Sequence, residues 1–199
     1  MVGSNALVIG GTGFVGRHTV AELLEHGYDV TVLTRDTHGF QFPDEMGVDH
    51  VVGDRSEKET LGDTAQRTDP DVVIDCALYH PADARTATNV FADVDAYVYV
   101  SSGAVYSRQE IPKREDETPL YDCTPEQADD SSMKTYGPRK AECDRLVRAA
   151  ATDGVPATSV RPTVVYGPQT IPGVGSSPAA DEGAWTDDIP ATWADEDVP

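Results

Sequence analysis

Cysteine is scarce in this chain, and its three residues lie far apart. Cys76, Cys123 and Cys143 form no CxxC pair and no cluster with histidine, and the five histidines lie singly. Closely spaced cysteine and histidine indicate zinc sites, and a dense, even set of cysteines indicates a disulfide framework. The sequence therefore predicts neither a metal site nor a disulfide framework.

Long hydrophobic runs and basic residues are also in short supply. No apolar stretch approaches the about 20 residues of a membrane span, and no basic-plus-apolar leader is present. We therefore expect an intracellular, cytoplasmic protein with no membrane partner. The formal net charge is -20, with 35 acidic and 15 basic residues. A surface this negative repels phosphate backbones, so no nucleic-acid partner is expected.

The acidic residues are spread along the whole chain, and lysine is rarer than arginine. Dispersed carboxylates keep a protein solvated in concentrated salt, so this composition is typical of a halophilic protein. An acidic protein from an ordinary environment is the alternative.

A glycine-rich turn near the start is the most informative feature that is present. The apolar run 6–9 leads into Gly10, Gly13 and Gly16, and an amphipathic segment follows. In the order strand, turn, helix, such glycines are typical of dinucleotide binding. Gly10 permits a sharp turn, Gly13 lets the backbone approach a diphosphate, and Gly16 lets the helix pack on the sheet. The amides of the first helical turn then face the phosphates.

Apolar periodicity predicts strands that alternate with helices along residues 5–168. Ser56, with Glu59 three residues on, is expected to cap the second helix, and a polar loop is expected over 108–130. Such alternation predicts an α/β fold, a doubly wound parallel sheet of the Rossmann type. We expect strands at 6–9, 30–33, 50–52, 72–74, 96–101 and 157–160. We expect a first helix that follows the glycine turn and is capped by Gly27, and further helices at 56–67, at 81–93, and from Ser131 or Ser132 to about 153.

Two domains of unequal kind are expected. Residues 1–168 form the dinucleotide-binding domain. Residues 169–199 carry seven acidic residues and no basic one, with neither helical nor strand periodicity, so a disordered or loosely docked tail is predicted there. An exposed strand at 157–160 would leave an open sheet edge, which favours association into a homodimer.

A tyrosine and a lysine four residues apart form the candidate catalytic pair. Tyr136 and Lys140 would share one face of a helix, and the ammonium is expected to lower the pKa of the phenol. The pair would then exchange a proton with an alcohol or a carbonyl. Ser102 follows the fifth predicted strand, at the sheet edge where such folds bind ligands, and its hydroxyl would stabilise charge on the reacting oxygen.

Taken together, these motifs resemble the extended short-chain dehydrogenase/reductase superfamily, and within it the NAD(P)-dependent epimerase/dehydratase family. The matching segments occur in the family's order over nearly all of residues 5 to 168: GGTGFVG at 10–16, VVGDRS at 51–56, DVVIDCA at 71–77, VSSGAVY at 100–106, YGPRK at 136–140 and SVRPTVVYGP at 159–168. Past Gln169 the family pattern stops, so the resemblance implies that the lobe which selects the substrate is largely missing.

The resemblance also implies a role for individual residues. Tyr136 would be the acid/base, Lys140 its partner and a ribose ligand, and Ser102 the catalytic hydroxyl. The cofactor would be held by these further residues: Gly10, Thr12, Gly13, Phe14, Val15 and Gly16 in the glycine turn, Thr34 and Arg35 after the second strand, Asp54 and Arg55 at the adenine, Cys76 and Ala77 in the cleft, and Pro162 near the nicotinamide.

The choice of cofactor depends on the end of the second strand. NAD-binding proteins carry an acidic residue there, whereas this chain has Thr34 and then Arg35. Arginine suits a 2′-phosphate, which favours NADP, while Asp36 keeps NAD as the alternative. The expected function is an oxidoreductase, epimerase or dehydratase that acts by hydride transfer on a sugar nucleotide or related carbonyl or alcohol, a small-molecule substrate. A non-catalytic NAD(P)-binding regulator and an inactive truncated fragment are the alternatives.

Overall fold

The computed structural model describes residues 4–35 and 42–167. Asp36 and the predicted tail at 169–199 lie outside these ranges. The helices and strands follow the predicted alternation: β1 (Asn5–Ile9), α1 (Phe14–Glu25), β2 (Asp29–Thr34), η1 (Asp44–Met46), β3 (Asp49–Val52), α2 (Lys58–Thr68), β4 (Val72–Asp75), α3 (Pro81–Val90), β5 (Ala96–Val100), η2 (Gly103–Val105), α4 (Pro125–Asp129), η3 (Met133–Thr135), α5 (Tyr136–Thr152) and β6 (Ala157–Val160).

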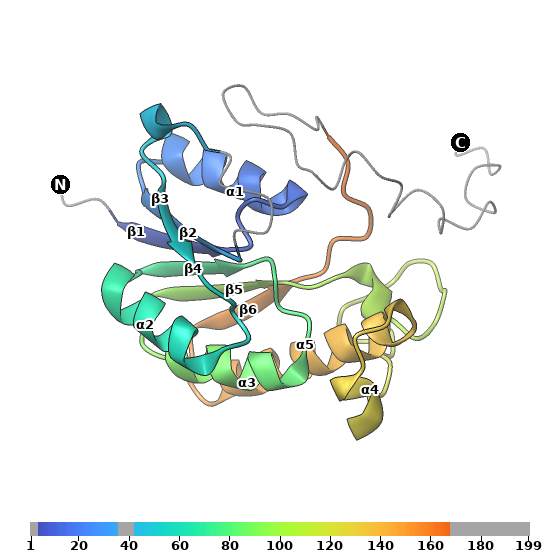
Figure 1. Cartoon of the computed structure of the whole chain (residues 1–199). Coiled ribbons are helices and arrows are strands. Elements are labelled where there is room, and N and C mark those ends of the chain that lie inside the picture. Colours follow the sequence, from blue (N-terminus) through green and yellow to red (C-terminus); the bar gives the residue numbers. More distant parts are fainter. Residues whose placement is uncertain (1–3, 36–41, 168–199) are drawn as a thin grey trace.

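The six strands form one parallel sheet in the order β3-β2-β1-β4-β5-β6. Helix α1 lies on one face, and α2, α3 and α5 cover the other (Figure 1). The predicted doubly wound, Rossmann-type α/β fold is therefore confirmed. The strand order reverses between β1 and β4, and in sheets of this kind ligands bind at the carboxyl ends of the strands beside that point.

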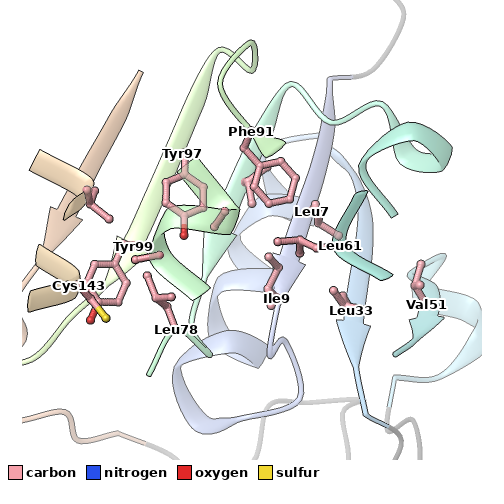
Figure 2. Close-up of a cluster of buried hydrophobic side chains, with 14 residues drawn as sticks. Leu7, Ile9, Leu33, Val51, Leu61, Leu78, Phe91, Tyr97, Tyr99 and Cys143 are labelled. Atoms are coloured by element: carbon pink, nitrogen blue, oxygen red, sulfur yellow. The ribbon is translucent and has the colours of Figure 1, made fainter. Parts of the chain in front are cut away.

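Two apolar clusters hold the layers together, one on each face of the sheet. In β1, Ala6 and Val8 face α1, whereas Leu7 and Ile9 face α2 and α3, because successive side chains point to opposite faces. Figure 2 shows the larger cluster, in which Leu7 and Ile9 lie in a layer that extends to Tyr97. A strand buried on both faces reads as a continuous apolar run, which is why 6–9 is so apolar.

The side chains of the sheet are less completely buried toward β6. Val98 in the middle of β5 is only partly buried, and Val160 at the end of β6 is 52% exposed. In the described ranges β6 is an edge strand, as expected from the sequence. Homodimer formation through this edge stays a prediction.

Local structure differs from the predictions at four places. The last predicted helix, α5, begins at Tyr136 rather than at Ser131 or Ser132, after the short η3. Ser56 does not cap α2, because its hydroxyl and its amide both donate to the Asp54 carboxylate and the helix begins two residues later. The third helix ends at Val90 rather than at residue 93. The expected loop at 108–130 contains a short helix, α4, which Thr124 caps through a reciprocal capping box with Gln127.

Within the part of the chain that the structure describes, no helix is long and apolar enough to cross a membrane. The same residues include no group of three or more histidine, cysteine or acidic side chains placed to bind a metal ion.

Candidate functional site

The glycine turn joins β1 to α1 at the carboxyl edge of the sheet. Gly10 has a φ of +77°, a conformation that other residues rarely adopt, and this allows the sharp exit from the strand. A Cβ on Gly16 would lie 2.4 Å from the carbonyl oxygen of Gly10, so only glycine lets the helix approach the turn this closely. The local fold thus requires both glycines, as predicted.

Gly13 differs, because nothing in the protein itself requires a glycine at this position. Its φ of -71° and ψ of 172° are open to any residue, and an added Cβ would meet only the Gly10 oxygen, at 3.5 Å. The residue is exposed and forms the N-cap of α1, with no side-chain cap and no acidic residue in the first turn. A bare backbone at a helix N-terminus, with room for a close approach, suits an anion such as a diphosphate.

The catalytic candidates meet at the same edge of the sheet, beyond β5. Ser102 follows β5 and caps η2, where its hydroxyl oxygen accepts a hydrogen bond of 3.2 Å from the Ala104 amide. Tyr136 is the first residue of α5. Gly137 brings the two elements together, since a Cβ there would lie 2.7 Å from the Ala104 carbonyl oxygen. Ser102 then lies close enough to Tyr136 for its hydroxyl to lower the pKa of the phenol.

Lys140 lies one turn further along α5, with 1% of its surface exposed. Its ammonium donates to the carbonyl oxygens of Leu78, at 3.0 Å, and Val100, at 2.8 Å, and so joins the ends of β4 and β5. An ammonium group has three donors, so one remains for a ligand hydroxyl. Burial lowers the pKa of Lys140 to about 8.

Aromatic rings surround this ammonium. Its nitrogen lies 4.4 Å from the ring centroid of Tyr99, 5.2 Å from that of Tyr79 and 6.0 Å from that of Tyr136. Distances of this size place the cation over rings that attract it, which offsets part of its desolvation. The predicted pair is thus part of a cluster of three tyrosines and one lysine.

The acidity of Tyr136 differs in direction from the sequence-based expectation. Burial raises the pKa of Tyr136, and the nearby Ser102 hydroxyl and the Arg139 charge lower it only in part. We expected the Lys140 ammonium to lower it overall. That expectation is wrong, because the loss of water around the phenol outweighs the attraction of the nearby charges. A phenol of this kind is protonated, and therefore a donor, at neutral pH.

At the other end of the same edge lie the residues predicted to select the cofactor. Thr34 ends β2, and its hydroxyl is hydrogen-bonded to His50 Nε2 at 2.8 Å. Arg35 follows and is exposed. The Asp54 carboxylate accepts from the amide and hydroxyl of Ser56, and these bonds lower its pKa, with a smaller effect from the Arg35 charge. Asp54 and Arg35 are thus close enough to interact, which agrees with one subsite after β2 and β3.

Arg55 was expected to contact the adenine, but its side chain is buried and bound to other groups of the protein. Its guanidinium is 8% exposed, forms a buried ion pair with Asp75 and lies 3.4 Å from the Asp83 carboxylate. Asp75 also accepts from the Tyr97 hydroxyl at 3.0 Å. This group is therefore engaged inside the protein, and it ties the loop after β3 to β4 and α3.

Cys76 and Ala77 leave β4 beside the glycine turn. The Cys76 amide donates to the Ile9 carbonyl oxygen at 2.9 Å, and a Cβ on Gly10 would lie 3.0 Å from the Ala77 Cβ. Burial raises the pKa of the Cys76 thiol to about 12, so it stays protonated at neutral pH. Their placement next to the turn is the one that was predicted for residues lining a cofactor cleft.

The segment after β6 returns to the same region. The Pro162 carbonyl oxygen accepts from the Gly103 amide at 2.7 Å, directly beside Ser102. Arg161 holds this segment in place through bonds to Asp144 at 2.6 Å and to the Tyr106 hydroxyl at 3.1 Å. The structure therefore brings Pro162 to the end of the site where the nicotinamide was expected.

Sequence reasoning missed several residues of this region. Tyr79 and Tyr99 flank the lysine, Asp75 anchors Arg55, and Arg139 binds the loop after β4. A signal existed only for Asp75, at the end of the fourth strand, and for Tyr79, in the loop that follows it. Arg139 bonds to Tyr79 and Tyr99 contacts Lys140 across distant segments, so no local pattern marks these contacts.

Comparison with known proteins gives a consistent result. Residues 6–179 match the model of a family described as the NAD dependent epimerase/dehydratase family. The chloroplast stem-loop binding protein of 41 kDa b of Arabidopsis thaliana is 28% identical over 173 residues, which cover 81% of this chain and 42% of that protein. A decarboxylating sterol-4-alpha-carboxylate 3-dehydrogenase of Candida albicans is 24% identical over 200 residues, which cover 87% of this chain and 55% of that protein.

Among solved structures, dTDP-glucose 4,6-dehydratase of Bacillus anthracis in complex with NAD superposes with a TM-score of 0.67 at 22% identity. The match covers 85% of this chain and 57% of the dehydratase. The likeness shows a shared fold. The chain spans about half of the length of these relatives.

Proposed function

The chain belongs to the NAD dependent epimerase/dehydratase family, and we propose that it binds a nicotinamide dinucleotide along the carboxyl edge of its sheet. The observation that carries the proposal is Gly13, an exposed N-cap whose glycine serves no packing role, at the bare start of α1. The α1 amides would hold the diphosphate. The adenosine would extend toward Arg35 and Asp54, and the nicotinamide toward Ser102, Tyr136 and Pro162.

Arg35 supports NADP as the preferred cofactor. It is the exposed cation at the end of β2, where a ribose 2′-phosphate would lie, and a guanidinium binds phosphate through charge-assisted hydrogen bonds. NAD remains the alternative in this proposal, because Asp36 is adjacent in sequence.

We propose that Tyr136 exchanges a proton with the oxygen of an alcohol or carbonyl substrate. When bound, the nicotinamide ring would supply hydride transfer to or from the adjacent carbon. The phenol is protonated at neutral pH because burial raises its pKa, so it is suited to donate to a carbonyl oxygen. The Ser102 hydroxyl would donate to the same oxygen. Lys140, held by two carbonyl groups, would keep one donor for a ribose hydroxyl.

The proposed substrate class is a sugar nucleotide or a related carbonyl or alcohol. The proposed reaction is oxidation or reduction, epimerisation or dehydration. A second candidate is a cofactor-binding protein without turnover. Both candidates predict cofactor binding, and only the first predicts that Tyr136 is needed for turnover.

The test is a titration of the full chain with NAD and with NADP in high salt, followed by thermal shift. We expect both cofactors to raise the melting temperature, NADP at lower concentration. A Tyr136→Phe variant is expected to keep cofactor affinity and to lose any turnover with sugar nucleotides. No stabilisation by either cofactor would refute the proposal, and equal turnover in the variant would refute the role of Tyr136.

A further inference from the structure

Arg139 lies between the two proposed catalytic residues of α5 and has no role in the function proposed so far. It is three residues after Tyr136 and directly before Lys140, and only 3% of its surface is exposed. A buried guanidinium must be hydrogen-bonded, since desolvation of an unpaired charge is very unfavourable. The identity of its partners therefore shows what holds it in place.

The guanidinium binds two segments that are distant in sequence. One side donates to the Tyr79 carbonyl oxygen at 3.1 Å and to His80 Nε2 at 3.3 Å, both in the loop after β4. The other donates to the Ser132 carbonyl oxygen at 3.1 Å and the Thr135 hydroxyl at 3.3 Å, both directly before α5. One planar group thus fixes the start of the helix that carries Tyr136 against the loop after β4.

That loop carries the Tyr79 ring. The centroids of Tyr79 and Tyr136 are 6.4 Å apart with a tilt of 45°. Arg139 binds the backbone of Tyr79 and the residues that precede Tyr136, so it holds together the two segments that carry these phenols. Loss of these bonds would free the first turn of α5 on the side that faces the loop.

Among the described residues Arg139 forms no direct ion pair, although the Asp130 carboxylate lies close enough for the Arg139 charge to lower its pKa. Among residues 4–35 and 42–167, no carboxylate lies within 4.0 Å of its nitrogens, whereas Arg145 on the same helix pairs with Glu142 at 2.9 Å and Asp122 at 3.8 Å. All four partners of Arg139 are uncharged acceptors, since His80 accepts with Nε2 and donates with Nδ1 to the Ala128 carbonyl oxygen.

We propose that Arg139 is the positioning residue of Tyr136, fixing the start of α5 against the loop after β4 and placing a positive charge near the phenol. The inference rests on the proposed function in so far as Tyr136 is the proton-transfer group. It adds a second cation to the tyrosine–lysine pair.

Several other groups act on the same phenol. Tyr79 after β4 and Lys140 on α5 face it at the distances given above, and the Ser102 hydroxyl lies on the β5 side. Asp130 is bound to the hydroxyls of Ser132 and Thr135 before the helix. Of these groups, Ser102 and Arg139 lower the pKa of Tyr136 against the effect of burial.

The experiment is a titration of the tyrosine ring carbons by NMR in the full chain, with no cofactor or substrate added. The eight tyrosines are labelled at Cζ, and Tyr136 is assigned from the signal that is lost in Tyr136→Phe. Wild type is compared with Arg139→Gln, with Arg139→Lys, and with Arg145→Gln as the control on the same helix. Hydrogen exchange of the amides at 136–139 is measured in parallel.

We expect Arg139→Gln to raise the pKa of Tyr136 and to speed exchange at the start of α5. Arg139→Lys keeps the charge but loses the planar fork, so it should titrate like wild type and still exchange faster. Arg145→Gln should change neither property. An unchanged Tyr136 titration in a folded Arg139→Gln protein would overturn the inference.

If Arg139→Gln does not fold, the Arg139→Lys variant alone tests the proposal. Faster exchange at 136–139 with a wild-type titration supports the proposal, and wild-type protection there contradicts it. Failure of the proposed function is seen separately, as absence of cofactor binding by the wild-type protein, because the titration uses neither cofactor nor substrate.

Discussion

Replacing the motif glycines one at a time would separate a ligand contact from a packing contact. Gly13 and Gly16 differ in the space around them. A Cβ added to Gly13 would have room, whereas a Cβ added to Gly16 would collide with backbone atoms. We therefore expect Gly13→Ala to abolish tight cofactor binding while the protein stays folded. We expect Gly16→Ala to destabilise the fold itself.

The stability changes follow from the local geometry. As an N-cap, alanine lowers the free energy of unfolding by about 0.5–1 kcal/mol relative to glycine. Alanine also restricts the unfolded chain, which raises the free energy of unfolding by about 0.4–1 kcal/mol. Gly13→Ala should therefore change the free energy of unfolding by less than about 1 kcal/mol. In Gly16→Ala the new Cβ would lie 2.4 Å from the Gly10 oxygen and 2.7 Å from the Gly11 Cα. Such overpacking costs about 1–3 kcal/mol, or several degrees of melting temperature.

Cofactor affinity, unlike stability, should respond strongly to Gly13→Ala. A methyl group at Gly13 would occupy the space through which a diphosphate approaches the α1 amides, and we expect at least a tenfold loss of affinity, about 1.4 kcal/mol. The assay is thermal unfolding with and without NAD or NADP. Gly62→Ala is the matched control, since Gly62 lies inside α2 with nothing within 4 Å of an added Cβ. It should stabilise the protein by about 0.5–1 kcal/mol and leave binding unchanged.

Two results would refute this reasoning. Wild-type affinity in Gly13→Ala would show that the start of α1 does not contact the cofactor. A loss of stability in Gly13→Ala as large as in Gly16→Ala would show that Gly13 is needed for packing.

Three further predictions use other parts of the site. Arg35→Ala should weaken NADP binding more than NAD binding, because only NADP has a 2′-phosphate, and equal losses in parallel titrations would reject this assignment. Gly137→Ala should displace the first turn of α5, since its Cβ would lie 2.7 Å from the Ala104 carbonyl oxygen; turnover should fall far more than cofactor affinity, and unimpaired turnover would contradict it. Asp75→Asn should destabilise the fold by about 3 kcal/mol in urea unfolding, because it leaves Arg55 buried with one carboxylate partner fewer, and a change under about 1 kcal/mol would show that the pair adds little.

Local sequence sufficed for the parts of the fold that local physics determines. The run 6–9 is apolar at every position because β1 is buried on both faces, and the glycines follow it because the turn and helix packing require them. The parallel sheet follows from the alternation of strands and helices, whereas the strand order and the meeting of Ser102 with Tyr136 come from the structure. The cap of α2 was wrong because Asp54 competes for Ser56 within three residues, which no helix-start pattern takes into account.

The electrostatics of the site were beyond sequence reasoning. The spacing of Tyr136 and Lys140 places them on one helix, but the sign of the pKa change depends on burial, which is a tertiary property. The partners of Lys140 are the carbonyl groups of Leu78, just after β4, and of Val100, at the end of β5, which are 62 and 40 residues away in the chain. The ion pair of Arg55 likewise depends on α3 and β4 meeting the loop after β3.

The placement of the basic residues explains how so acidic a chain suits an anionic cofactor. Arg17, Arg55, Arg139 and Lys140 are buried, and each lies just beyond the carboxyl end of a strand or in the first turns of the following helix. Among the described residues, Arg55 is paired with carboxylates, whereas Arg139 and Lys140 are hydrogen-bonded to neutral groups. A buried charge is screened less by salt than the charges of the acidic exterior. Arg139 and Lys140 thus place two buried cations near Tyr136 in a protein with a net charge of -20.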